Sequence, residues 1–223
     1  MLMYLLLVGP TILLAMAAQG MTRSAFNKYS KIRTARGLTG AQAARLLLDR
    51  AGIRDVEVVQ SQGFLSDHYN PMNKTLALSP QVYSMPSVSA VGVACHEAGH
   101  AIQHATNYAP LWARSALVST ARFSNLGIGI IFIGLLLSAQ GLVAIGALLF
   151  SGIVVFQLVT LPVEFDASAR AKRLAFEHGL VTTQEQQGMS KVLNAAALTY
   201  VAAALGSLAT LAYYLLQMGQ MDD

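Results

Sequence analysis

Charged residues are scarce in this sequence. Asp, Glu, Lys and Arg make up 12% of its 223 residues, where a soluble globular chain carries about 25%. Hydrophobic residues reach 54%, and the mean hydropathy is +0.49. This composition argues against a fully soluble enzyme, a disordered chain and a nucleic-acid-binding protein. It is typical of a membrane protein.

The sequence also has little cysteine and only a small excess of positive over negative charge. Cys95 is the only cysteine, which excludes an intramolecular disulfide framework and a cysteine-based zinc finger. The balance of 15 Lys and Arg against 11 Asp and Glu is only slightly basic. It suits the cytoplasmic face of a membrane better than DNA.

The sequence predicts four membrane spans. A helix that crosses a bilayer needs roughly 20 mainly apolar residues, and the apolar runs of this sequence provide four such segments. The first occupies residues 1–19; a cleavable signal peptide is the alternative, but no basic residue precedes the run. Residues 124–161 are too long for one crossing and contain a polar break at 138–141, so we expect a hairpin of two helices. The hairpin has no ionisable residue, which favours close packing at its glycines over a pore. The fourth span follows at residues 195–217.

The distribution of basic residues predicts the orientation in the membrane. Residues 20–123, between the first two spans, carry 11 Lys and Arg, five of them directly behind the first span. Residues 162–194 carry four more, whereas the tail, residues 218–223, ends in Asp222 and Asp223. Because basic residues collect on the cytoplasmic side, both connecting segments are expected in the cytoplasm and both termini outside.

Residues 20–123 have the pattern of a small α+β unit. Helices are expected where apolar residues recur at helical spacing behind a capping residue, and strands where they alternate near turn residues. The expected elements are a helix over 41–51 capped by Thr39, a strand at 56–58, a strand pair that joins Leu65 to 75–78 around the turn 70–73, and a helix over 87–105. The last of these is apolar on most sides but too short to span a bilayer, which predicts a buried core helix.

This helix contains the motif H-E-x-x-H. His96 and His100 are four residues apart, so their side chains project from one face about 6 Å apart along the axis. That spacing suits two ligands of one Zn²⁺ ion. Glu97 is turned about 100° from His96 and is placed to take a proton from a water molecule rather than to bind the metal. An accidental match to the motif is the alternative, but burying His and Glu side chains without partners in an apolar core helix would cost folding free energy.

A catalytic zinc site needs a third protein ligand. His104 continues the histidine stripe but lies about 12 Å from His96 along the helix, so the three histidines cannot share one ion. His68 and His178 are two further candidates.

The best candidate for the third ligand is Glu164, directly after the third span. Ser168 follows four residues later on the same helical face, and Asp166 points the opposite way. A solvated charge at the start of a helix is an equally good interpretation of Glu164 from these residues alone.

Three motifs in this order, LSDHYNP, HEAGHAIQ and LPVEFDASARA, resemble the YugP-like membrane zinc metallopeptidases over most of the chain. The layout is more distantly similar to the gluzincins of the CAAX-prenyl-protease type, whose third ligand comes from E-x-x-A-D. The resemblance implies that His96, His100 and Glu164 bind zinc and that Glu97 is the general base. Ser168 stands where the gluzincin pattern has Asp, which leaves Asp166 as the candidate for orienting the ligands.

The same resemblance implies that an extended substrate pairs with an edge strand beside the zinc helix, for which we expect residues 74–78. His68 or Tyr69 is a candidate for polarising the substrate carbonyl; a cluster that stabilises the following turn is the alternative. Cys95 is expected to be a small buried residue, with a redox-active thiol as the alternative.

Together these observations predict a mainly α, four-span helical membrane protein with a small α+β cytoplasmic zincin-like unit. The predicted activity is that of a zinc-dependent endopeptidase. Because Glu164 follows a span closely, its substrates are expected to be membrane-associated or juxtamembrane polypeptides. An intramembrane site-2-type protease is disfavoured, since the H-E-x-x-H helix does not span and no L-D-G motif is present. The alternative from another class is a non-enzymatic membrane scaffold that holds zinc structurally; such a site has no use for Glu97.

Overall fold

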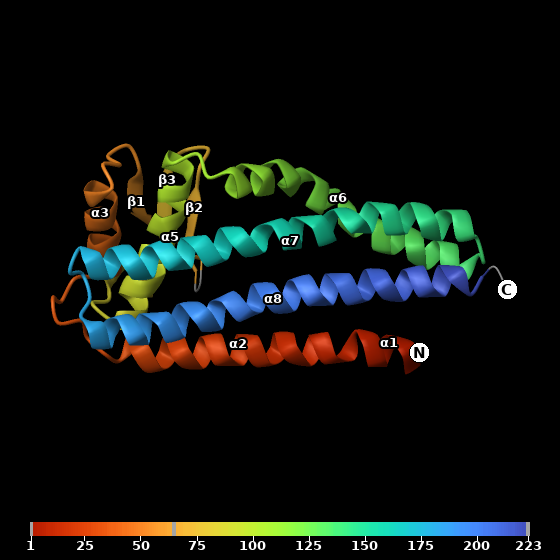
Figure 1. Cartoon of the computed structure of the whole chain (residues 1–223), viewed down its shortest axis with the longest axis horizontal. Coiled ribbons are helices and arrows are strands. Elements are labelled where there is room, and N and C mark those ends of the chain that lie inside the picture. The colour runs from red at the N-terminus through yellow and green to blue at the C-terminus, as the bar shows by residue number, and fades with distance from the viewer. Residues whose placement is uncertain (1, 64–65, 222–223) are drawn as a thin grey trace. The chain divides into compact units, whose positions relative to one another are not determined.

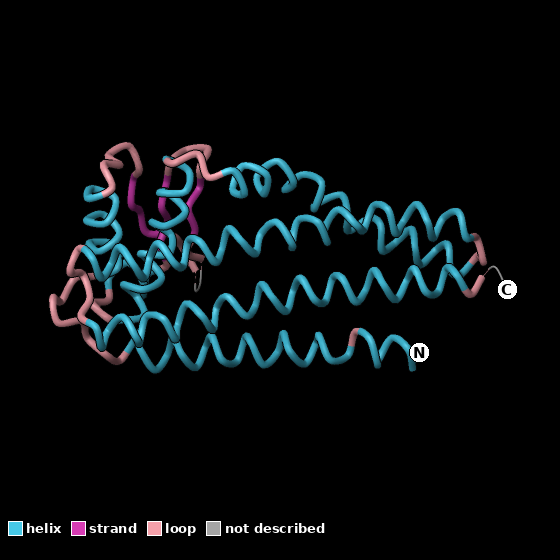
Figure 2. Tube along the Cα trace, in the orientation of Figure 1, coloured by secondary structure: helices cyan, strands magenta, loops and turns pink. Residues whose placement is uncertain are grey.

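The computed structural model describes residues 2–63 and 66–221. Leu65, Asp222 and Asp223 lie outside the described residues. The elements follow in the order α1 (Leu2–Leu7), α2 (Gly9–Ser30), α3 (Gly40–Arg50), β1 (Glu57–Gln60), β2 (His68–Asn70), β3 (Thr75–Leu78), α4 (Pro80–Ser84), α5 (Val88–Ala105), α6 (Ala109–Leu136), α7 (Gln140–Glu177) and α8 (Thr183–Gly219). Figure 1 labels these elements except α4, and Figure 2 shows that the chain is mainly helical with one small sheet.

Four helical segments of the described residues are long and apolar enough to cross a membrane, which agrees with the number predicted. They are Leu2–Ser30, Ala109–Leu136, Gln140–Glu177 and Thr183–Gly219. The chain divides into two compact units, which are best described separately. The first contains Met1–Ala18, Ala109–Pro162 and Leu198–Asp223; the second contains Gln19–Tyr108 and Val163–Ala197.

Glycines in the first unit let α6 and α7 approach closely. A Cβ atom added at Gly127 would lie 2.6 Å from the carbonyl oxygen of Gly146, so only glycine fits there. Ile131 and Phe150 are buried nearby, whereas many other large apolar side chains of α6 and α7, including Phe132 and Leu148, are exposed. Apolar side chains that face outward from a helical unit suit contact with lipid.

In the second unit, the two predicted helices are confirmed as α3 and α5. Thr39 caps α3: its hydroxyl accepts a hydrogen bond from the backbone N–H of Gln42, and the Gln42 side chain accepts one from the backbone N–H of Thr39. Ser87 caps α5 with a single hydrogen bond: its hydroxyl accepts from the backbone N–H of Ala90. The core between α3, α5 and the sheet is aliphatic, with Leu47, Leu48, Leu76, Leu78 and Val91 fully buried.

The three strands of the second unit form a sheet in the order β1-β3-β2. β1 is parallel to β3, and β2 is antiparallel to β3, with His68 opposite Ala77 and Asn70 opposite Thr75. The hairpin predicted around the turn 70–73 is present, with its turn one residue later, at residues 71–74. The expectation that 74–78 is an edge strand is wrong, because β3 lies between the other two strands. Its residues Leu76 to Leu78 are all buried rather than alternating, as is typical of a central strand.

Helix α7 continues without a break through Pro162 into the second unit. Proline lacks the N–H that would bond to the preceding helical turn, yet the helix goes on for 15 further residues, to Glu177. In this part, Ala167, Ala171 and Ala175 are fully buried at intervals of four residues. A stripe of small side chains on one face lets another helix approach this segment closely.

Candidate metal centre

Close packing of α5 against α7 brings the site together. A Cβ atom added at Gly99 would lie 2.6 Å from the carbonyl oxygen of Ala167, a distance that real side chains do not show. Glycine at this position of the H-E-x-x-H motif therefore allows the backbone of α7 to pass directly beside the face of α5 that carries His96 and His100. The same packing carries Glu164, one turn before Ala167, to the two histidines.

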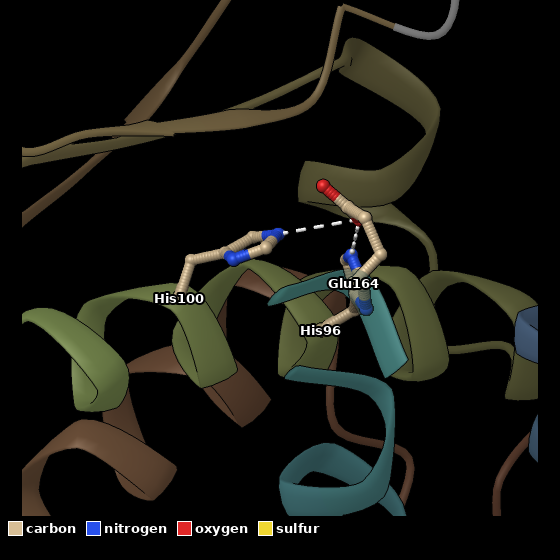
Figure 3. Close-up of side chains that lie close together, drawn as sticks. All are labelled: His96, His100 and Glu164. Carbon is tan, nitrogen blue, oxygen red and sulfur yellow. Dashed lines mark hydrogen bonds and ion pairs between the residues drawn. The ribbon is translucent and has the colours of Figure 1, made fainter. Parts of the chain in front are cut away.

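The three predicted ligands converge on one point. The Nε2 atoms of His96 and His100 lie 3.2 Å and 3.6 Å from Oε2 of Glu164, and Figure 3 shows both imidazoles turned toward this carboxylate. Glu164 is only 2% exposed. The interpretation of Glu164 as a solvated charge at a helix start is therefore wrong.

The donor atoms fit a zinc ion. Zn–N and Zn–O bonds of about 2.0–2.1 Å at tetrahedral angles place neighbouring donor atoms about 3.3 Å apart. The two distances of 3.2 Å and 3.6 Å are close to that value, and all three ligand atoms lie within 4.8 Å of one another. Two imidazole nitrogens and one carboxylate oxygen also form the donor set that catalytic zinc sites use.

Polar side chains hold both imidazole rings through their other nitrogen atom. Nδ1 of His96 lies 3.1 Å from the hydroxyl oxygen of Ser168, and Nδ1 of His100 lies 3.0 Å from Oε1 of Gln103. Ser168 thus stands in the place where the gluzincin pattern has a carboxylate. Such partners orient metal-binding imidazoles and fix their tautomers.

Asp166, the predicted orienting residue, reaches His100 only indirectly, through Gln103. It accepts hydrogen bonds from Nε2 of Gln103 at 2.8 Å and from Nε of Arg170 at 2.6 Å. The prediction therefore identified the network but not the residue that makes the contact. Gln103 was missed, although its place three residues after His100 on the same helix is a signal that the sequence contained.

Glu97 is buried beside the two histidines. Burial raises the pKa of its carboxyl group above the ordinary value, against the opposing effect of His96 and His100. A raised pKa makes a carboxylate a stronger base. It also brings the pKa closer to neutral pH, where a general base works best.

The other histidines lie outside the cluster. His104 and Tyr69 are hydrogen-bonded to each other, 2.8 Å apart, and His68 contacts the backbone carbonyl of Ser66 with Nδ1. Neither these two histidines nor His178 belongs to the group of described residues that can hold a metal. Tyr69, one of the two candidates for polarising a substrate carbonyl, is thus already engaged with His104.

Cys95, next to His96, is fully buried in the core. Burial raises the pKa of its thiol to about 12. A thiol in this state is not reactive near neutral pH. The prediction of a small buried residue at this position is confirmed.

Comparisons with known proteins show which family the chain belongs to. Residues 4–219 match the model of a family described as "Putative neutral zinc metallopeptidase". The chain is 46% identical over 192 residues to the "Putative membrane protease YugP" of Bacillus subtilis (strain 168), an alignment that covers 86% of this chain and 85% of the relative. No solved structure matches the chain. Since the family model covers nearly the whole chain, and the Bacillus subtilis relative is 46% identical over 192 residues, the chain belongs to the family described as "Putative neutral zinc metallopeptidase".

Proposed function

We propose that this chain is a zinc-dependent endopeptidase of the gluzincin type, in which His96, His100 and Glu164 bind the metal and Glu97 is the general base. The observation that supports this assignment most is the convergence of the three ligand atoms from two helices, with a buried carboxylate next to them in the sequence. A purely structural zinc site would surround the ion with four protein ligands and would not need Glu97.

When bound, zinc supplies Lewis-acid chemistry that activates a water molecule and polarises a peptide carbonyl. Glu97 takes one proton from the attacking water while the oxygen of that water forms a bond to the carbonyl carbon of the substrate. The same carboxyl then delivers the proton to the amide nitrogen as the carbon–nitrogen bond breaks. The burial of Glu97 supports this role, since a carboxylate with a raised pKa accepts the first proton more readily.

We propose that the substrate binds as an extended chain along β2. This strand forms one edge of the sheet and contacts α5. Pairing with an edge strand uses main-chain hydrogen bonds, which predicts broad sequence specificity.

We also propose that the substrates are membrane-associated and that the site faces the cytoplasm. Helix α7 is continuous from its apolar part to Glu164, which follows Leu161 by only three residues, about 4.5 Å along the axis. A ligand so close to the end of an apolar stretch favours substrates held at the membrane surface. The 11 Lys and Arg of residues 20–123 support the cytoplasmic side.

Glu97→Gln and Glu164→Ala test the assignment in the purified full-length protein. The probe is a fluorescently labelled unstructured polypeptide attached by a lipid anchor to liposomes that contain the protein, with zinc content measured in parallel. Glu97→Gln should keep its zinc and lose activity by about 10²–10⁴-fold, as is typical for loss of a general base. Glu164→Ala should lose both zinc and activity, because one ligand is missing.

Glu177→Gln is the matched control. It removes an exposed carboxylate that pairs with Arg173 on the same helix as Glu164, and it should leave both zinc content and cleavage unchanged. Wild-type cleavage by Glu97→Gln would refute the general-base role. A zinc-loaded wild-type protein that cleaves neither this probe nor a broad peptide library would favour the scaffold function instead.

A further inference from the structure

Gln103 is a fully buried polar residue that contacts both of the helices that carry metal ligands. It lies on α5 and has no exposed surface. Its Oε1 atom faces Nδ1 of His100 at 3.0 Å. Its Nε2 atom donates hydrogen bonds to the backbone carbonyl of Val163 and to the carboxylate of Asp166, each at 2.8 Å. Val163 and Asp166 lie on either side of Glu164 in α7.

These contacts determine which way the amide of Gln103 points. A backbone carbonyl only accepts hydrogen bonds, and so does an ionised carboxylate. The two contacts with Val163 and Asp166 therefore require the NH₂ group of the amide, which has two N–H bonds to donate. The amide oxygen is left to face His100.

The orientation of the amide in turn determines where the proton of His100 sits. An amide oxygen cannot donate a hydrogen bond, so Nδ1 of His100 must carry the proton and donate it to Gln103. In the neutral imidazole the lone pair is then on Nε2, the atom that faces Glu164 at 3.6 Å. Nε2 with a free lone pair is the form of histidine that binds a metal.

We infer that Gln103 is a positioning residue for the metal site: its amide holds His100 in the metal-binding tautomer and ties this ligand to the segment of α7 that carries Glu164. The inference rests on the proposed zinc function and deepens it. Arg170 anchors the far end of the network at Asp166 and stacks over the ring of Tyr108, 5.5 Å from its centre.

The two histidine ligands differ in this respect. Ser168, the partner of His96, has a hydroxyl group that can rotate and can either donate or accept a hydrogen bond. It therefore orients the ring of His96 without imposing a tautomer. Both partners connect an α5 ligand to α7, since Ser168 itself lies on α7. Of the two, Gln103 is the one that imposes a tautomer, and it does so through its contacts with Val163 and Asp166.

The first test compares Gln103→Leu with the matched control Gln186→Leu. Gln186 also donates its side-chain amide to a backbone carbonyl of α7, that of Lys172 at 3.0 Å, which lies eight residues beyond Glu164. The zinc dissociation constant of the full-length protein in detergent is measured by competition with a chromophoric chelator, and thermal unfolding of the metal-free protein is recorded. Gln103→Leu should weaken zinc binding by about 10–100-fold, the usual effect of losing such a partner. Gln186→Leu should leave the zinc affinity unchanged.

A second test reverses the direction of the hydrogen bond between residues 103 and 166 with a pair of substitutions. Gln103→Glu keeps an acceptor for His100 but loses both donors and places a carboxylate against Asp166, so zinc affinity should fall. Adding Asp166→Asn supplies an amide donor to residue 103 and retains an oxygen that accepts from Arg170. The double variant should recover part of the lost affinity, because the hydrogen bond between residues 103 and 166 is replaced by one of similar strength in the opposite direction, while the bond to the carbonyl of Val163 stays lost.

Three outcomes would overturn the inference. Gln103→Leu that binds zinc as tightly as the wild type shows that the amide does not position His100. If Gln103→Leu does not fold, the paired variants decide, and a double variant no better than Gln103→Glu refutes the network. If the wild-type protein binds no zinc, the proposed function is refuted together with the positioning role. If the wild type binds zinc and Gln103→Leu has the same zinc affinity, the positioning role alone is refuted.

Discussion

Gly99→Ala should disrupt the metal site by separating two helices. The new methyl group would lie 2.6 Å from the carbonyl oxygen of Ala167 and 3.2 Å from its carbonyl carbon and Cα. The atoms that it meets belong to the backbone of α7, so no side chain can rotate away. The helices must instead move apart, or one of them must shift along the other.

The displacement follows from the contact distances. Because Cβ contacts below 3.0 Å are essentially never seen, the gap of 2.6 Å must grow by at least about 0.4 Å. Metal–ligand distances tolerate only about ±0.2 Å, and Glu164 lies one turn from the point of contact. We expect zinc affinity to fall at least about tenfold, the lower end of the range for losing a supporting contact at a metal site. Overpacking should cost about 1–3 kcal/mol of unfolding free energy, partly offset by about 1 kcal/mol from the better helix propensity of alanine.

Gly92→Ala is the matched control, since it adds the same methyl group to the same helix. A Cβ atom there would meet Cγ of Met189 at 3.1 Å, and a flexible methionine side chain can move by a few tenths of an ångström. The assay is the zinc dissociation constant by chelator competition, with cleavage and thermal unfolding measured alongside. If Gly99→Ala binds zinc and cleaves like the wild type, the close approach of α5 and α7 does not determine the site. If Gly92→Ala loses as much zinc affinity, the loss comes from α5 itself.

Three further predictions concern stability, ligand orientation and topology. Metal-free Glu97→Gln should unfold at a higher temperature than the wild type at neutral pH. The pKa of Glu97 is higher in the folded state than in the unfolded state, so the folded state binds the proton more tightly. At pH values above the ordinary pKa of about 4.3, ionisation of Glu97 therefore lowers the stability of the wild type. The advantage should disappear below that pH, and a gap that widens on acidification would contradict this. Ser168→Ala should weaken zinc binding about tenfold in the chelator assay because His96 loses its partner; unchanged affinity would show that Ser168 is dispensable. A C-terminal tag should be digested from outside intact cells while a tag at Gly37 is protected; the reverse pattern would invert the topology.

Much of the local structure was predictable because its causes are local. The capping residues Thr39 and Ser87, and the length and polarity of the helices that follow them, are properties of neighbouring residues. The hairpin around residues 71–74 was likewise predictable from its turn residues. The order of strands was not predictable in this way. β3 was expected at an edge, but the position of a strand in a sheet depends on which segments pair with it, and β1 pairs with β3 although β2 lies between them in the sequence.

The same distinction applies to the metal site. The pair of histidines and the adjacent Glu97 can be identified from the sequence alone, since a spacing of four residues on one helix places two side chains on the same face. Glu164 was already the best candidate for the third ligand, but the residues around it alone suited a solvated charge equally well. The tertiary structure removes that alternative, because it brings the carboxylate of Glu164 to His96 across 68 residues of sequence. It also decided that Gln103 and Ser168 orient the rings while Asp166 acts through Gln103. Those contacts exist because Gly99 lets two helices touch, and the distance between two helices depends on the packing of the whole unit rather than on any local pattern.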